Sequence, residues 1–228
     1  MKNLFLLVAI ATMLLPLSAA ADNNEIKNGD FAVALNSNDV NPSAMQMGKW
    51  YIYSNRPSLD KYTIEPVEDA QNGNAVRIEN TVDAAWYSHF LVQKVVLDAA
   101  KGVYTLSIDA KADSDAPTLR VFMLDAVGEK DAIFVARPNF DPADAKVASH
   151  SPAAFTRGVR GKKWKTYTFE FDASKFVNTF YSPNAAAKTG NSIEFEDLEG
   201  KNEFYVAIQV TPVGQAVVLD NVVLAPQK

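Results

Sequence analysis

Strict alternation between apolar and polar side chains is the strongest structural signal in this sequence. Residues 103–110 (VYTLSIDA) place Tyr104, Leu106 and Ile108 on one side and mostly polar residues on the other, and residues 164–171 (WKTYTFEF) also alternate. Successive side chains of an extended strand point to opposite faces, so a period of two indicates a strand with one buried face. These two segments therefore predict a sheet that covers a core on one side.

Turn-forming residues divide the rest of the chain into further short segments rich in β-branched and aromatic residues. The additional strands that we expect are residues 75–78, 86–97, 118–124, 133–136, 203–210 and 216–224. A short helix is considered only over residues 173–180, where Val177 and Thr179 are poor helix formers. Many strands with turns between them predict an all-β fold, a two-sheet antiparallel β-sandwich of the jelly-roll type.

This fold predicts specific neighbours and a specific core. We expect the first and last strands to lie close in space, with Leu219 buried together with the apolar side of residues 103–110. Two long stretches, residues 125–163 and 178–202, interrupt the rhythm of strands. Such insertions lie at the rims of a sandwich and often carry function.

The N-terminus has the features of an export signal. Lys2 precedes an apolar run over residues 4–17, and small residues follow at positions 18–21. The run is too short for a membrane-spanning helix, which needs ~20 apolar residues, and Pro16 interrupts it. We therefore expect residues 1–21 to be a signal peptide and residues 22–228 to form one exported domain, periplasmic or extracellular, with no membrane span.

Composition excludes several kinds of site and partner. The chain has no cysteine, so it has no disulfide and no thiol chemistry, and its two histidines, His89 and His150, are poorly spaced for zinc. A net charge of −5 argues against nucleic acid as a partner, because phosphate binding favours a basic surface. One basic cluster is interpreted as protection of an edge strand. It consists of Arg157, Arg160, Lys162, Lys163 and Lys165.

Short motifs along the chain resemble one known family. They are residues 26–31 (IKNGDF), Trp50, residues 73–78 (GNAVRI), residues 95–112, residues 164–171 and residues 219–224 (LDNVVL). In this order they resemble the carbohydrate-binding modules of families 4 and 9, which occur beside bacterial cellulases, xylanases and laminarinases. The resemblance implies a galactose-binding-like jelly roll with a carbohydrate ligand, although one sandwich fold hosts modules with different ligands.

The resemblance also implies a structural metal ion. The family often holds calcium between the acidic residue after the opening Phe and the Asp of the last strand. Asp220 matches the second position, but Ala32 follows Phe31, and Asp30 points the other way in an extended chain. Calcium needs six to eight oxygens, so Asp220 with backbone carbonyls is left as the candidate site. No other cofactor is expected.

Two aromatic segments are candidates for binding a sugar, whose apolar face stacks on rings and whose hydroxyls bond polar side chains. These segments are residues 50–56 and 86–89, which we expect to flank one groove. The candidate carbohydrate-binding residues are Trp50, Tyr51, Tyr53, Arg56, Trp86, Tyr87, Gln93 and Arg120. Adjacent aromatics point to opposite faces of a strand, so one of each pair belongs to the core, as we also expect for Trp164.

Catalytic signals are few. An acidic run, Glu194, Glu196, Asp197 and Glu199, contains the residue type of a glycosidase, but a charge run of this kind is typical of a solvated loop. The leading hypothesis is a secreted, non-catalytic module that binds a polysaccharide or glycan. The alternatives are a structural or adhesive cell-envelope protein that uses the same sandwich for protein contacts, and a glycan-active enzyme.

Overall fold

A computed structural model describes residues 23–33, 35, 43–54, 63–67, 74–81, 89–128, 132–139, 155–178, 192–194 and 201–228. The expected signal peptide lies outside these residues. Among the described residues, no helix is long and apolar enough to cross a membrane.

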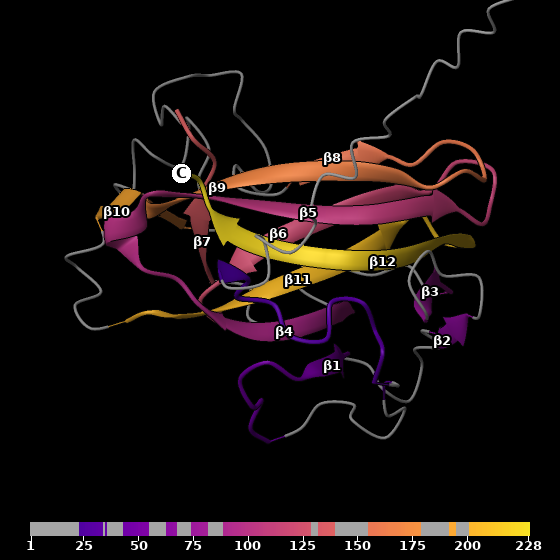
Figure 1. Ribbon diagram of the computed structural model, residues 1–228, viewed down its shortest axis with the longest axis horizontal. Coiled ribbons are helices and arrows are strands. Elements are labelled where there is room, and N and C mark those ends of the chain that lie inside the picture. The colour runs from indigo at the N-terminus through magenta and orange to yellow at the C-terminus, as the bar shows by residue number, and fades with distance from the viewer. Residues whose placement is uncertain are drawn as a thin grey trace, which may run out of the picture.

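The described chain is built almost entirely from strands (Figure 1). They are β1 (Trp50–Tyr53), β2 (Thr63–Val67), β3 (Ala75–Asn80), β4 (Phe90–Val96), β5 (Val103–Ala112), β6 (Thr118–Leu124), β7 (Ile133–Ala136), β8 (Phe155–Gly158), β9 (Lys165–Asn178), β10 (Ser192–Glu194), β11 (Glu203–Thr211) and β12 (Gln215–Pro226), with a short 3-10 helix, η3 (Ala99–Lys101). The predicted all-β fold is confirmed. The helix considered over residues 173–180 was wrong, because β9 continues to Asn178 and buries Phe176 and Val177 against its neighbours.

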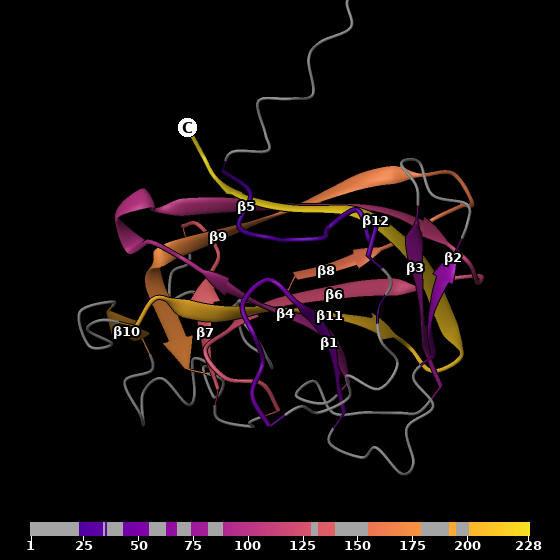
Figure 2. The same ribbon diagram turned by 60° about the horizontal axis from the view of Figure 1, so that its bottom comes forward.

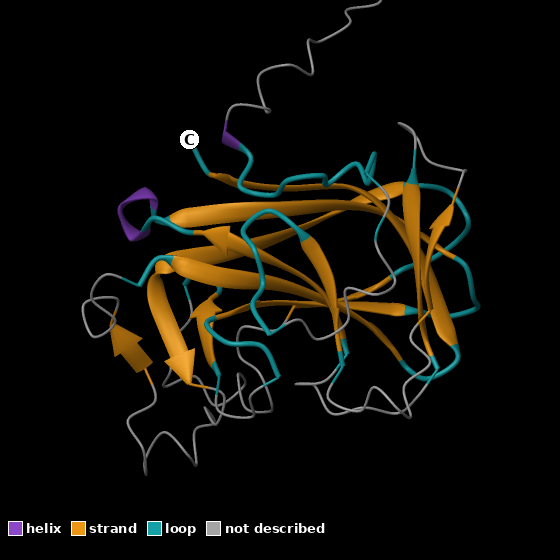
Figure 3. Ribbon diagram, turned by 90° about the horizontal axis from the view of Figure 1, so that it is seen from below, coloured by secondary structure: helices purple, strands orange, loops and turns teal. Residues whose placement is uncertain are grey.

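The strands pair antiparallel in one curled path, in the order β1-β4-β11-β6-β7-β9-β5-β12-β3-β2. Figure 2 shows β9, β5 and β12 above β6, β11 and β4, and Figure 3 shows the same two layers edge-on. The two expected sheets are therefore present as layers of a sandwich, but hydrogen bonds connect them through β7 and β9.

The long strand β9 makes this connection. Its first half pairs with β5, up to Asp172 opposite Val103, while its last residues pair with β7. The pairing with β7 shifts between Val135 and Ala136, which marks an irregularity in the ladder. An irregularity of this kind bends a strand, so β9 passes from one layer toward the other.

The core fills the space between the layers. Tyr104, Leu106, Ile108 and Leu219 have no exposed surface, as predicted, and they pack with inward side chains of β9 and β11. Burying one such aliphatic side chain contributes about 1.5–3 kcal/mol relative to leaving it exposed. The alternating pattern that predicted these strands is therefore the pattern of core burial.

Trp164 is not a core residue, contrary to the prediction. It is half-buried and shares its side of the alternating segment with the exposed residues Thr166 and Thr168. Phe169 and Phe171 lie on the buried side of the same segment. The Lys111 ammonium lies 4.9 Å from the centre of the Trp164 ring, which suits a ring at the surface.

The N-terminal segment lies against the last strand. Glu25 N donates to Leu224 O (2.8 Å) and Val222 N donates to Gly29 O (2.9 Å). A Cβ atom at Gly29 would lie 2.0 Å from Val222 O, so this approach requires glycine. Of the strands expected from the sequence, the first (β3) does pair with the last (β12), whereas the first strand of the structure, β1, pairs with β4.

The basic cluster lies on β8, on the turn that follows it and at the first residue of β9. In the described part of the chain β8 pairs with β6 alone, and all five basic side chains are exposed. Its role in protecting an edge strand stays a prediction.

Candidate functional site

The outer face of the layer formed by β1, β4, β11 and β6 carries a second cluster of aromatic side chains. Alternate residues of these strands point inward to the core, and the residues between them point outward. The strand register aligns Tyr51, Val92, Ala207 and Phe122 across this outer face. The cluster contains Tyr51, Phe90, Val92, Phe122, Leu124, Phe134 and Ala207, with Met45, Tyr53, Val127 and Tyr205 packed against it. We call this surface the outer face.

Trp50 and Tyr51 point to opposite sides of β1, as the sequence predicted for adjacent aromatics. Trp50 belongs to the core, where its ring centroid lies 5.6 Å from that of Phe31 and its Nε1 donates to Asn28 O (3.0 Å). Its position and contacts serve the fold, so we do not retain Trp50 as a sugar-binding residue.

Tyr51 and Tyr53 lie on the outer face. Tyr51 is buried, and its hydroxyl accepts a hydrogen bond from Gln46 N (3.0 Å). Tyr53 is half-buried; its ring is 6.3 Å from that of Phe90, and a Cβ atom at Gly128 would lie 1.8 Å from its hydroxyl. Both tyrosines therefore help to build the outer face, and direct stacking of a sugar on either ring stays a prediction.

Gln93 and Arg120 also lie on opposite sides of the layer. Gln93 is fully buried on the inner side of β4, where its amide accepts from Lys27 N and donates to Lys27 O, both at 2.8 Å. It therefore fixes the N-terminal segment and, being fully buried, offers no surface to a sugar. Arg120 is half-buried on the outer face, with its guanidinium 5.3 Å from the Phe122 ring.

Three of the candidate residues, Arg56, Trp86 and Tyr87, lie outside the described residues. The groove expected between residues 50–56 and 86–89 therefore stays a prediction. Of the acidic run, Glu196, Asp197 and Glu199 also lie outside the described residues, as does the side chain of Glu194.

A polar pocket of about 410 Å³ lies at one end of the outer face. It is lined by Lys94, Asp125, Lys201, Asn202, Glu203 and Tyr205. These residues come from β4, from the end of β6 and from the start of β11, which the sheet order places side by side. Tyr205 belongs to both the pocket and the outer face, so the pocket is continuous with the aromatic cluster.

Two ion pairs organise this pocket. Lys94 pairs with Glu203, and Lys201 Nζ lies 3.0 Å from Asp125 Oδ2. Asp125 Oδ1 also accepts from Ile133 N (2.6 Å), which fixes the carboxylate. The hydrogen bond to Glu203 raises the pKa of Lys94, while burial opposes this shift. The pocket is thus charge-balanced, with ordered donors and acceptors beside one ring.

Sequence reasoning did not select the pocket residues. Two signals pointed near them, because Asp125 opens the first long insertion and Lys201 and Asn202 end the second. Tyr205 was a further signal. It is an aromatic residue on one side of β11, whereas Phe204 and Val206 lie on the other side. Long-range strand pairing brings these pieces together, and a local pattern does not reveal it.

The candidate calcium position offers few oxygen ligands. Asp220 is buried, and its Oδ1 accepts from Asn221 N (2.7 Å). Asp30 is exposed and bonds Ala32 N (3.3 Å). Among the described residues no group of three or more His, Cys, Asp or Glu could hold a metal ion. These side chains alone do not form a calcium site, and the calcium at Asp220 stays a prediction that melting curves with and without a chelator test.

The chain matches one family model and resembles solved structures over most of its length. The model of a family described as a domain of unknown function (DUF4627) matches residues 24–224. No curated protein sequence matches the chain. A crystal structure of a presumed sugar-binding protein from Bacteroides thetaiotaomicron is 25% identical, with a TM-score of 0.75, and the match covers 90% of this chain and 100% of that one.

A structure of a family 4 carbohydrate-binding module (CBM4) is also similar. It is 18% identical, with a TM-score of 0.51, and the match covers 89% of this chain and 99% of that one. At this identity the likeness shows the fold. The resemblance to the family 4 modules that the sequence motifs suggested is confirmed at that level.

Proposed function

Because the chain belongs to the DUF4627 family, described as a domain of unknown function, we propose its role from its own site: it is an exported, non-catalytic protein that binds a glycan at the outer face. The observation that carries this proposal is the pocket beside Tyr205, where one half-buried ring adjoins two ordered lysine–carboxylate pairs. The likeness to a presumed sugar-binding protein supports it.

The chemistry of the pocket suits a sugar. A sugar ring has an apolar face that packs on an aromatic ring, and hydroxyls that both donate and accept hydrogen bonds. The pocket supplies carboxylate acceptors from Asp125 and Glu203, ammonium donors from Lys94 and Lys201, and the amide of Asn202. Pre-organised polar groups of this kind fix the orientation of a bound ligand.

The same contacts favour binding over hydrolysis. A glycosidase uses two carboxyl groups, one of which must be protonated to act as the general acid. Here Glu203 pairs with Lys94 and Asp125 pairs with Lys201. Each carboxylate is thus held as an ion-pair acceptor, and we propose that neither acts in catalysis.

A role in protein contacts has less support. In the described part of the chain the exposed large apolar residues are Val33, Met47 and Val213, which lie on three separate segments. Isolated apolar residues are ordinary at a protein surface, whereas a contact site for another protein is usually a continuous patch. We therefore favour a glycan over a protein partner.

Affinity electrophoresis against a panel of soluble polysaccharides tests the proposal. We expect at least one polysaccharide to retard the protein, and Tyr205→Ala to weaken that binding about five-fold, since losing a ring contact costs roughly 1 kcal/mol. Glu203→Gln should also weaken binding, because it removes an acceptor and breaks the pair with Lys94.

Tyr167→Ala and Glu170→Gln are the matched controls. Tyr167 is a half-buried tyrosine and Glu170 an exposed glutamate, both on β9 in the other layer. They should leave the retardation unchanged. Equal loss in Tyr205→Ala and Tyr167→Ala, in step with their melting temperatures, would show that only stability had changed and would reject the site.

A further inference from the structure

Arg120 on β6 is a cation without a carboxylate partner in the described part of the chain. Its Nη1 donates to Gln209 Oε1 (3.3 Å), and its guanidinium lies over the Phe122 ring at 5.3 Å. Among the described residues no carboxylate forms an ion pair with it. A guanidinium carries five N–H donors, so most of its hydrogen-bonding capacity is unused within the described part of the chain.

Burial makes this arrangement costly. Desolvation lowers the pKa of Arg120 below its ordinary value, although an arginine stays protonated at neutral pH. A charge that is removed from water without a partner destabilises the protein, and proteins usually place a carboxylate beside it. Among the described residues no carboxylate lies beside Arg120, which is typical of a group that meets its counter-ion in a ligand.

The guanidinium is also held in place. Arg120 lies directly opposite Gln209 in the register of β6 and β11. Gln209 is buried, with its amide nitrogen directed at His89 O (3.5 Å), so its oxygen faces Arg120. The side chain thus projects from a paired strand with a fixed neighbour, which is how a binding group is pre-organised.

Arg120 and the pocket share the outer face. Arg120 and Leu124 are four residues apart on β6, and their partners Gln209 and Tyr205 are four apart on β11. At ~3.3 Å per residue this separation is about 13 Å. A ligand that contacts both Tyr205 and Arg120 must span this distance, because Phe122 and Ala207 between them have no exposed surface to offer it.

We propose that Arg120 is an anion-binding subsite of the outer face and that the ligand is an acidic glycan, carrying a uronate carboxylate or a sulfate ester. A planar guanidinium binds such a group through two parallel hydrogen bonds, which a lysine does not reproduce. This inference rests on the proposed glycan-binding function and adds the class of glycan.

Two pairs of polysaccharides that differ only in their anionic group test it. Polygalacturonate is compared with its carboxyl-reduced form, and dextran sulfate with dextran. The parent protein should bind one acidic member about ten-fold or more tightly than its neutral partner, as expected for hydrogen bonds to a charged group. The pair that shows the preference identifies the source as carboxylate or sulfate, and added salt should reduce the preference.

Arg120→Gln should abolish this preference, and Arg120→Lys should restore part of it. Arg157→Gln is the matched control, because Arg157 is an exposed arginine on the neighbouring strand β8 and belongs to the basic cluster. It should change nothing. Melting curves follow each variant, since a purely structural Arg120 would alter the melting temperature and leave the acidic-to-neutral ratio intact.

The outcomes separate this inference from the proposed function. If Tyr205→Ala weakens binding while acidic and neutral polysaccharides bind alike, the glycan site stands and the anion subsite is rejected. An acidic preference that survives Arg120→Gln and disappears in Arg157→Gln also rejects it, because the basic cluster is then the source. If neither member of either pair binds, the inference is rejected along with its premise.

Discussion

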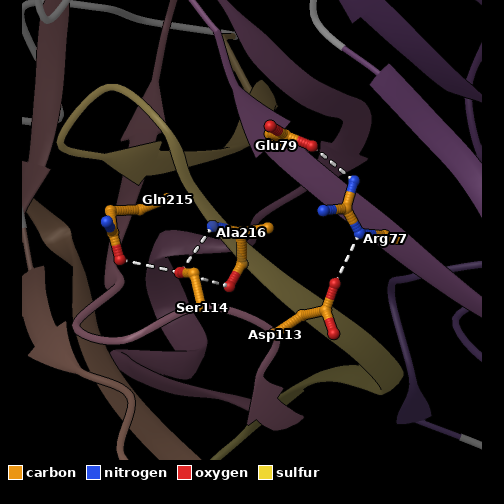
Figure 4. Close-up of polar contacts among 6 residues, drawn as sticks. All are labelled: Arg77, Glu79, Asp113, Ser114, Gln215 and Ala216. Carbon is orange, nitrogen blue, oxygen red and sulfur yellow. Dashed lines mark hydrogen bonds and ion pairs between the residues drawn. The ribbon is translucent and has the colours of Figure 1, made fainter.

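Arg77 and Arg120 show two opposite uses of the same side chain. Arg77 on β3 is held between two carboxylates, with its Nε 2.6 Å from Asp113 Oδ2 and its Nη1 2.6 Å from Glu79 Oε2 (Figure 4). Its pKa is raised, mainly by the hydrogen bond to Asp113. Arg120 lies in the other layer, and burial lowers its pKa.

The difference separates a region that completes the fold from the region that we propose binds a ligand. Beside Arg77, Ser114 Oγ donates to Gln215 Oε1 (2.7 Å) and accepts from Ala216 N (2.9 Å), so the polar groups in Figure 4 satisfy one another. On the outer face the ion pairs lie around a pocket, and Arg120 has one hydrogen bond within the described residues. Polar groups that bond one another stabilise the fold, whereas polar groups with unused hydrogen-bonding capacity are available to a ligand.

The largest effect on stability is expected for Ser114→Ala. The substitution removes the acceptor of Ala216 N and one donor to Gln215 Oε1, and an unsatisfied backbone group costs about 1–3 kcal/mol. Urea unfolding should show this loss, while glycan binding stays at the parent level. Ser107→Ala, at a half-buried serine on β5, should cost less; equal losses would contradict the importance of the network.

A smaller and more informative effect is expected for Arg77→Gln. It leaves Glu79 and Asp113 without their cation, but these side chains are 30% and 44% exposed, so the loss should be about 1 kcal/mol or less and should shrink in salt. Arg120→Gln removes a buried charge that has no carboxylate partner among the described residues, so it should not lower the unfolding free energy. If Arg120→Gln proves the more destabilising of the two, the contrast drawn here is wrong.

Two raised pKa values predict an effect of pH on stability in alkaline solution. The pKa of Lys94 is raised by its hydrogen bond to Glu203, and burial raises the pKa of Tyr104. A folded-state pKa above the unfolded value gives stability that is complete below the unfolded pKa, about 10 for both residue types, and is lost as pH rises through the folded pKa.

These two groups should therefore leave the free energy of unfolding unchanged near neutral pH and should lower it above about pH 10. Lys94→Gln and Tyr104→Phe should each make the fall less steep in pH-dependent urea unfolding. Stability that rises above pH 10 would contradict both assignments.

The sequence predicted the fold where one face of a strand is buried. β5 and β9 alternate cleanly, and Leu106 and Phe169 lie in the core as that pattern requires. The pattern fails at β1, which was not among the expected strands, because Trp50 faces the core while Tyr51 is covered on the outer face. A strand buried on both sides has no polar phase and so no period of two.

The candidate site was predicted in part for the same reason. Tyr53 and Arg120 were selected by chemistry and do lie on the outer face, but Gln93, selected in the same way, faces inward while its neighbour Lys94 lines the pocket. A one-residue difference decides which face a side chain occupies. The face that each side chain of β4 occupies is set by the pairing between β4 and β11, which are far apart in the sequence.

An NMR titration with the best-binding glycan tests the central claim most directly. The account predicts saturating shifts in the amide signals of Lys94, Asn202, Tyr205 and Arg120, which map the ligand onto the outer face. The signals of Arg77, Asp113 and Ser114 should not move, since their polar groups are closed on one another. Saturating shifts around Arg77 with none around Tyr205 would contradict the account.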